Sequence, residues 1–353
     1  MSIRQHPSGG EAGQPPIGGT PPLNSIHFAG FNQNHGCFAI GMENGFRVYN
    51  SDPVKEKVRH TFDPPGLGFI EMLFRCNYLA LVGRSGSKEE VLNAPNRVVI
   101  WDDLQKKEAI TLEFSSDVKA VRLRRDRIVV ALSKVIKVFT FTQSPIELLT
   151  LETGLNERGI CVLCPSSSNS ILAYPGTEIG KVHIVNLGVL ENNSPTIINA
   201  HETPVICLAL NQEGTNLATA SEKGTLVRVF DTGTAKIIHE VRRGTSSANI
   251  YCINFSKDST MLCVSSDHGT VHVFLLSKDS SSQPKTGIFK LMATPRSELS
   301  IKMPEHTDRI CAFTEDPQGL VVVGLDGSYK KYSIEDLKGG YQEDKTCHLL
   351  DLS

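Results

Sequence analysis

Hydrophobic positions along this chain come in short runs that alternate with polar ones, a period typical of β-strands and not of helices. One unit recurs: a run rich in β-branched and aromatic residues, a polar turn, and a second run with a bulky residue near its end. The bulky positions are Tyr49, Trp101, Phe139, Val185, Phe230, Phe274 and Tyr332. They lie 38 to 58 residues apart, close to the repeat of WD-type propeller blades. We therefore predict an all-β fold, a seven-bladed β-propeller with four-stranded blades.

Turns that contain glycine separate the paired runs, where a hairpin needs a positive φ. The predicted blades begin near Asn24, Gly68, Asp117, Arg158, His201, Ala248 and His306. The C-terminal segment, which ends in Leu352, is expected to supply a strand that closes the ring. The alternatives are an open β-sandwich or two smaller β domains, but no linker-like break interrupts the repeat.

The chain divides into a tail and a folded part. Residues 1–23 are rich in Gly and Pro and nearly lack apolar side chains, so we expect a disordered N-terminal tail. Residues 24–353 are expected to form the propeller, with a loop insertion at about 276–303. No apolar stretch is long enough to span a bilayer, so we expect a soluble protein whose membrane contacts are peripheral.

Composition and motifs argue against several classes of function. The 36 basic and 38 acidic residues nearly balance, so an anion site must be a local cluster. The nine cysteines lie mostly in apolar runs, which suits a reducing compartment. Cys161 and Cys164 form one CxxC, but a zinc site needs a second pair of ligands. The common hydrolase and nucleotide-binding motifs are missing. We expect no enzymatic activity, no cofactor and no metal.

Basic and hydroxyl residues gather around Arg242, Arg243 and Gly244, between the fifth and sixth repeats. Adjacent side chains of an extended chain point to opposite sides, and arginine is suited to fork onto phosphate oxygens. Each flanking repeat carries Ser and Thr beside a Gly turn, and Arg228 and His272 occupy equivalent strand positions. The pattern predicts two similar phosphate pockets. Singly, these residues are also typical of ordinary hairpins and solvated linkers, but their duplication favours a functional role.

The same residues resemble the PROPPINs, a family of β-propellers that bind phosphoinositides. The resemblance is carried by the run Leu217 to Phe230 and by the Arg-Arg-Gly motif that follows it. It extends from about Phe28 to the C-terminus.

The resemblance implies two head-group pockets for phosphatidylinositol 3-phosphate and phosphatidylinositol 3,5-bisphosphate. The first would consist of His201, Thr219, Ser221, Gly224, Thr225, Arg228 and Arg242. The second would consist of Arg243, Gly244, Ser265, Ser266, Thr270 and His272. The resemblance also implies a monomeric, non-catalytic adaptor in autophagy that does not bind nucleic acid. It would move from the cytoplasm to preautophagosomal and endolysosomal membranes, and its early blades would bind a bridge-like lipid-transfer protein.

Two features depart from the family pattern. Val241 stands where Phe or Leu is usual, at a packing position where we expect little effect. The predicted insertion is short and poor in aromatic residues. Its candidates for entering the bilayer are Ile288, Phe289, Leu291 and Met292. The same stretch is equally well interpreted as a plain edge strand. The alternative function is a generic propeller scaffold for proteins without lipid binding.

Overall fold

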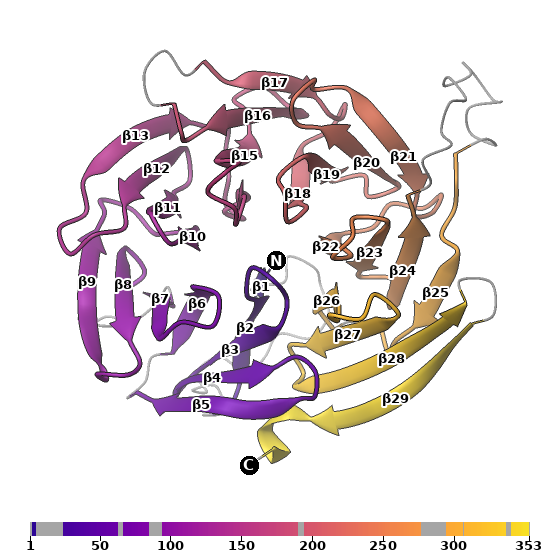
Figure 1. The fold of residues 1–353 in the computed structure, drawn as a ribbon, viewed down its shortest axis with the longest axis horizontal. Helices are drawn as coiled ribbons and strands as arrows, with labels where there is room; N and C mark the ends of the chain where they lie inside the picture. Colours follow the sequence, from indigo (N-terminus) through magenta and orange to yellow (C-terminus); the bar gives the residue numbers. More distant parts are fainter. Residues whose placement is uncertain are drawn as a thin grey trace, which may run out of the picture.

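Seven antiparallel sheets are arranged in a ring around a central axis (Figure 1). The computed structural model describes residues 2–4, 24–62, 66–84, 94–189, 194–276, 294–305, 307–336 and 340–352. Within these ranges the chain is all-β apart from one 3-10 turn, η2 (Leu349–Asp351). The prediction of a seven-bladed β-propeller is therefore confirmed.

The first four blades follow one another along the chain, each with its strands in sequence order. Blade 1 contains β1 (Ser2–Arg4), β2 (Ile26–Phe31), β3 (Cys37–Met42), β4 (Gly45–Asn50) and β5 (Lys55–Thr61). Blade 2 contains β6 (Leu67–Met72), β7 (Tyr78–Gly83), β8 (Arg97–Asp102) and β9 (Lys107–Glu113). Blade 3 contains β10 (Ala120–Arg124), β11 (Arg127–Ala131), β12 (Val135–Thr140) and β13 (Glu147–Glu152). Blade 4 contains β14 (Val162–Leu163), β15 (Ile171–Pro175), β16 (Lys181–Asn186) and β17 (Thr196–Asn199).

The last three blades repeat the same order. Blade 5 contains β18 (Val205–Leu210), β19 (Asn216–Ser221), β20 (Leu226–Asp231) and β21 (Ile237–Arg242). Blade 6 contains β22 (Ile250–Phe255), β23 (Met261–Ser266), β24 (Thr270–Leu275) and β25 (Leu299–Lys302). Blade 7 contains β26 (Arg309–Phe313), β27 (Gly319–Gly324), β28 (Ser328–Asp336) and β29 (Gly340–His348). The predicted starts lie within four residues of the first strand of blades 2 to 7 and of β2 in blade 1.

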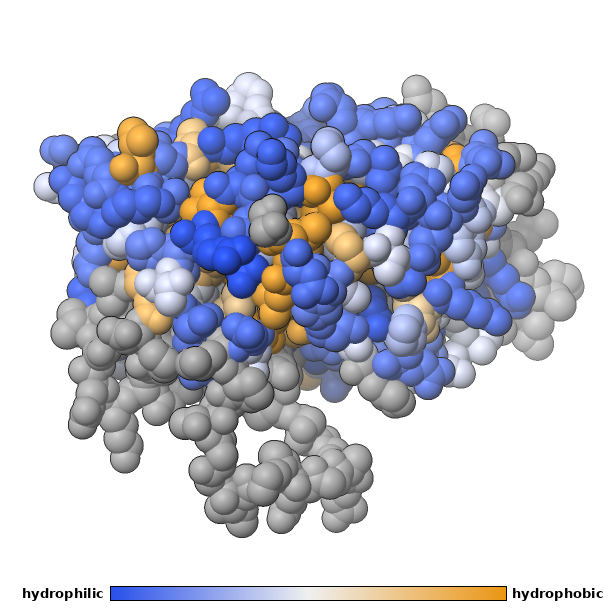
Figure 2. Space-filling model, turned by 90° about the horizontal axis from the view of Figure 1, so that it is seen from below, coloured by the Kyte–Doolittle hydropathy of each residue, from blue (hydrophilic) through white to orange (hydrophobic). Residues whose placement is uncertain are grey.

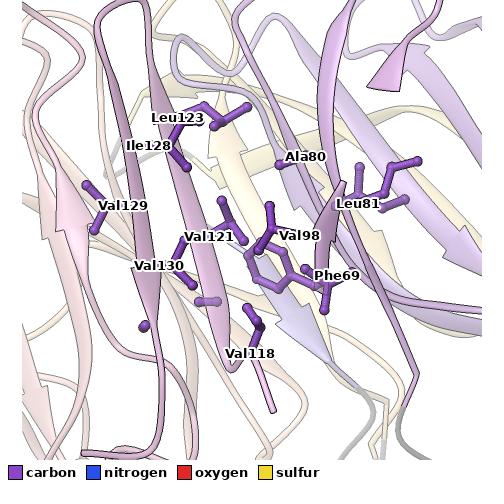
Figure 3. Packing of buried hydrophobic residues seen from close by; sticks show 14 of the residues in the cluster. Phe69, Ala80, Leu81, Val98, Val118, Val121, Leu123, Ile128, Val129 and Val130 are labelled. Carbon is purple, nitrogen blue, oxygen red and sulfur yellow. The ribbon is translucent and has the colours of Figure 1, made fainter. Parts of the chain in front are cut away.

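Burial explains why the pattern of apolar and polar residues differs between the inner and outer strands of a blade. Strand β3 is buried at every position, because neighbouring blades cover both of its faces. Strand β5 at the rim alternates between exposed and half-buried positions. The core lies between the blades: Phe69 and Val98 of blade 2 pack towards Val121 and Val130 of blade 3 (Figure 3). The rim of blades 1 and 7 is mainly hydrophilic, with a narrow hydrophobic strip between its polar residues (Figure 2).

Two predicted boundaries are wrong in part. Ser2–Arg4, assigned to the disordered tail, form β1, which pairs with β2 in the register Ser2 to Gly30. Ile3 is only 6% exposed, so a single apolar side chain anchors this short strand. The predicted insertion ends earlier than residue 303, because β25 is the outer strand of blade 6. The four candidates for bilayer entry, Ile288, Phe289, Leu291 and Met292, lie outside the described residues.

The C-terminal strand closes the ring in a way that the sequence did not reveal. Strand β29 is the outer strand of blade 7 and pairs with β28, so blade 1 and blade 7 share no sheet. Side chains join the two blades instead. The Tyr49 hydroxyl donates to the Leu349 carbonyl at 3.0 Å, and the Tyr329 hydroxyl donates to the Ser51 carbonyl at 2.7 Å.

Candidate functional site

The residues around the Arg-Arg-Gly motif lie at one edge of blades 5 and 6. Three segments meet there: the β19–β20 turn, the β23–β24 turn, and the link from β21 to β22. Gly224 has a φ of +61°, and a Cβ atom on it would come within 1.8 Å of the Ala248 carbonyl oxygen. Glycine therefore allows the blade 5 turn to pack directly on the link that follows Arg242 and begins with Arg243.

The first predicted set is brought together by strand register. Thr219 on β19 lies opposite Arg228 on β20, which lies opposite Glu240 on β21. The distance from His201 Nε2 to the Thr219 hydroxyl is 2.9 Å. Arg228 donates from Nε to Glu240 at 2.7 Å and from Nη1 to the Ala200 carbonyl at 2.6 Å. A carboxylate and a carbonyl thus hold the guanidinium of Arg228 beside His201.

The electrostatics of this set favour a neutral histidine. Burial, followed by the positive charge of Arg228, lowers the pKa of His201 to about 4. The carboxylate of Glu240 opposes this shift more weakly. In the free protein at neutral pH, His201 is therefore a hydrogen-bonding group and not a cation.

The second predicted set is organised by Arg243, which is buried. Its Nε donates to the Gly224 carbonyl at 3.0 Å, its Nη2 donates to the Ser246 carbonyl, and its Nη1 lies 3.4 Å from Nδ1 of His268. Burial, followed by the positive charge of Arg243, lowers the pKa of His272 to about 4. Arg243 thus joins the blade 5 turn and the link to His268 of blade 6.

Hydroxyl groups surround His272, although not all are those that the sequence indicated. Ser297 and Ser300 lie 3.1 and 3.0 Å from its Nδ1 atom. The hydroxyl of Thr270 donates to the His268 carbonyl at 3.2 Å. Ser265 differs: its hydroxyl donates to the Arg309 carbonyl of blade 7 at 2.7 Å, so it braces the neighbouring blade.

Each predicted set contains one buried donor without a partner among the described residues. In the first set it is Nε of Arg242, and in the second it is the hydroxyl of Ser266. The backbone of Arg242 is fixed, because its N–H donates to the Pro295 carbonyl at 2.7 Å. A buried donor with no acceptor destabilises the folded protein, so both atoms would gain from a ligand oxygen that reaches them after a small movement of the covering side chains.

The remaining predicted residues shape the turns. The Ser221 carbonyl accepts the N–H of Gly224 at 2.7 Å, and the Thr225 carbonyl accepts those of Arg243 and Gly244 at 2.9 and 3.4 Å. A Cβ atom on Gly244 would meet no atom within 4 Å, so the backbone there faces open space.

Four residues near the two predicted sets were not indicated by the sequence: Glu240, His268, Ser297 and Ser300. Two of them left a local signal, because Glu240 comes two residues before Arg242 and His268 immediately precedes the turn glycine Gly269. Ser297 and Ser300 gave no signal, because the pattern assigns their part of the chain to the insertion. In the described ranges no group of three or more His, Cys, Asp or Glu side chains could hold a metal ion. The same ranges contain no helix that is both long and apolar enough to cross a membrane.

Comparison with known proteins identifies the relatives of this chain. The PROPPIN family model matches residues 25–290. An SVP1-like protein 2 from Debaryomyces hansenii is 39% identical over 290 residues, which cover 72% of this chain and 66% of that protein. The match thus spans slightly less than two thirds of that relative. Autophagy-related protein 18e from Arabidopsis thaliana is 33% identical over 320 residues, covering 88% of this chain and 84% of that protein. The solved structure of Kluyveromyces lactis Hsv2 with its complete loop 6CD has a TM-score of 0.77 at 26% identity, covering 92% of this chain and 99% of that one.

Proposed function

Because this chain belongs to the PROPPIN family, we propose that it is a non-catalytic peripheral membrane adaptor for phosphatidylinositol 3-phosphate and phosphatidylinositol 3,5-bisphosphate. The two pockets would be the sets on either side of the Arg-Arg-Gly motif. The first would use His201, Thr219, Ser221, Gly224, Thr225, Arg228 and Arg242. The second would use Arg243, Gly244, Ser265, Ser266, Thr270 and His272.

The observation that carries this proposal is the pair of buried donors without partners, Arg242 Nε and the Ser266 hydroxyl. A phosphate group offers several strong acceptors and a negative charge. Bound in either pocket, it would accept from the free donor and would lie near a guanidinium, Arg228 or Arg242 in the first and Arg243 in the second. Ser265 would act indirectly, because its own hydroxyl is already committed to the Arg309 carbonyl.

We place the adaptor in autophagy, in agreement with the name of the Arabidopsis relative. There it would act on preautophagosomal and endolysosomal membranes. A bridge-like lipid-transfer protein would bind the early blades. The turn between β8 and β9 in blade 2 carries Leu104, which is 81% exposed, and the loop between β12 and β13 in blade 3 carries Ile146, which is 65% exposed. Both are available for a partner.

Liposome flotation tests the lipid-binding part. We expect the protein to float with vesicles that contain 3-phosphorylated phosphoinositide, and not with vesicles brought to the same charge with phosphatidylserine. Changing Arg242 and Arg243 to Thr should abolish flotation, because each lost charged contact to phosphate weakens binding by roughly 1.5–3 kcal/mol.

The matched control is Lys55→Thr together with Lys57→Thr, which removes two positive charges from exposed positions of β5, across the ring from the site (Figure 1). This variant should float like the wild type. Arg243 also holds the link, so the unfolding transition of the arginine variant must be measured beside it. Undiminished flotation of a folded arginine variant would refute the two-pocket proposal. Wild-type protein that never floats would favour the protein scaffold instead.

A further inference from the structure

A second group of arginines lies on the axis of the ring, away from the Arg-Arg-Gly site. Strand β1 and the N-terminus lie at the centre of the propeller (Figure 1). There β1 pairs with β2 of blade 1 and also approaches β22 of blade 6 and β26 of blade 7. The short strand therefore carries Arg4 into the axial channel.

The axial channel contains a cavity of about 90 Å³. Its charged lining residues are Arg4, Arg122, Glu157, Arg158 and Asp308. The space is large enough for several water molecules or one small oxyanion. Because it is too small for an inositol ring with its phosphates, its ligand cannot be the head group proposed for blades 5 and 6.

Arg4 lacks the acceptors that a buried guanidinium normally has. Its Nε and Nη2 atoms are shielded from solvent, and neither finds a hydrogen-bond partner in the part of the chain that the structure describes. The side chain instead lies over the ring of Phe69, with the guanidinium carbon 4.7 Å from the ring centre. Burial and then the like charge of Arg122 lower the pKa of Arg4 to about 9, and Asp117 opposes them only weakly.

The other charges of the cavity already have partners. Arg122 donates to Glu71 at 3.3 Å and to the Cys161 carbonyl at 2.9 Å. Arg158 donates to Asn249 at 2.8 Å. Of the two lining carboxylates, Glu157 lies 2.8 Å from the ammonium of Lys119. Asp308 lies near the Tyr251 hydroxyl, and burial followed by this carboxylate raises the pKa of that group. Among the described residues that line the cavity, Arg4 is thus the charged residue whose buried donors have no hydrogen-bond partner.

We propose that the axial cavity binds one phosphate-type oxyanion beside Arg4 and Arg122, with the Arg4 guanidinium turning its unpartnered Nε and Nη2 edge towards the cavity to meet it. These two nitrogens form one side of the guanidinium fork, the geometry that binds two oxygens of one anion. The anion would neutralise Arg4, reduce its repulsion with Arg122 and fasten β1 to the inner strands. The site is separate from blades 5 and 6 and does not depend on lipid binding.

Thermal unfolding with inorganic phosphate as the probe, against chloride at equal ionic strength, tests this site. Phosphate should raise the unfolding midpoint of the wild type by about 2–4 °C near saturation, because only the folded state offers the site. Arg4→Met should lose this increase. Without phosphate the variant should unfold at the same temperature as the wild type or higher, because it removes a buried charge with no partner.

Two further variants locate the effect. Lys55→Thr with Lys57→Thr should respond to phosphate like the wild type. Arg242→Thr with Arg243→Thr should keep the part of the response that Arg4→Met loses. An equal response in wild type and Arg4→Met would mean that phosphate acts elsewhere and would overturn the proposal. So would a response that disappears only in the Arg242 and Arg243 variant, because phosphate would then occupy the head-group pockets. A wild type that does not respond would also overturn it, while leaving the flotation result unaffected.

Discussion

The histidines of the two proposed pockets differ from free histidine in the same way. Burial and a nearby arginine lower the pKa of both His201 and His272 to about 4, whereas the unfolded value is about 6.5. Between these values the unfolded chain binds more protons than the folded chain. Stability from this source is therefore complete above about pH 6.5 and is lost as the pH falls towards 4.

We accordingly predict a pH-dependent difference between the wild type and His201→Gln with His272→Gln. The wild type should lose on the order of 2 kcal/mol per histidine between about pH 6.5 and 4, and the variant should lose less. Denaturant unfolding at several pH values measures this. The quantity to compare is the change of the unfolding free energy with pH, because the variant also loses hydrogen bonds at every pH. Parallel curves would show that these two histidines are not the source of the acid sensitivity.

At the scale of single elements, side-chain contacts between blade 7 and blade 1 close the ring. Blade 7 and blade 1 are joined by side chains and not by a shared sheet, and Tyr49 and Tyr329 are both fully buried at this junction. The ring of Phe38 stacks near both, with centroids at 5.2 Å from Tyr49 and 6.2 Å from Tyr329. An ion pair of 2.9 Å between Lys331 and Asp52 crosses the same junction.

Removing one hydroxyl from this junction should weaken closure without leaving a large cavity. Tyr49→Phe and Tyr329→Phe should each lower the free energy of unfolding by about 1–3 kcal/mol, because a buried carbonyl loses its donor. Tyr341→Phe is the control: Tyr341 is 40% exposed on the outer strand β29, so its change should stay within about 0.5 kcal/mol. Denaturant titration gives all three values. If the buried changes match the control, closure depends on packing alone.

The whole molecule presents both proposed pockets on one rigid ring. Two weak sites on one body bind a shared surface far more tightly than either does alone. Because Arg242 belongs to the first set and Arg243 to the second, removing one arginine should leave the other pocket usable.

Arg242→Thr alone should therefore reduce vesicle affinity by about 100-fold or more, while the remaining site keeps its affinity for a soluble short-chain lipid. Calorimetric titration with short-chain phosphatidylinositol 3-phosphate should give two sites in the wild type and one in the variant. Arg243→Thr should behave likewise through the other pocket. A wild-type stoichiometry of one would contradict the two-pocket arrangement.

The sequence by itself determined the repeat, the number of blades and the grouping of most candidate site residues. These features are local: the alternation of side chains specifies a strand, and Gly224 and Gly269 specify tight turns. The duplicated Ser, Thr and basic positions then follow from the repeat, because equivalent positions of adjacent blades lie side by side. For this reason the repeat alone is enough to predict that Arg228 and His272 occupy equivalent positions in blades 5 and 6.

Only the tertiary structure decided contacts between segments that are distant in the sequence. Strand β1 exists because it pairs with residues more than twenty positions away and buries Ile3 in the channel, and three residues alone carry no detectable period. Ser265 faces Arg309 because blade 7 closes against blade 6. The lowered pKa values and the unpartnered nitrogens of Arg4 have the same origin. Burial and charge proximity are set by how the blades pack, and no local pattern encodes them.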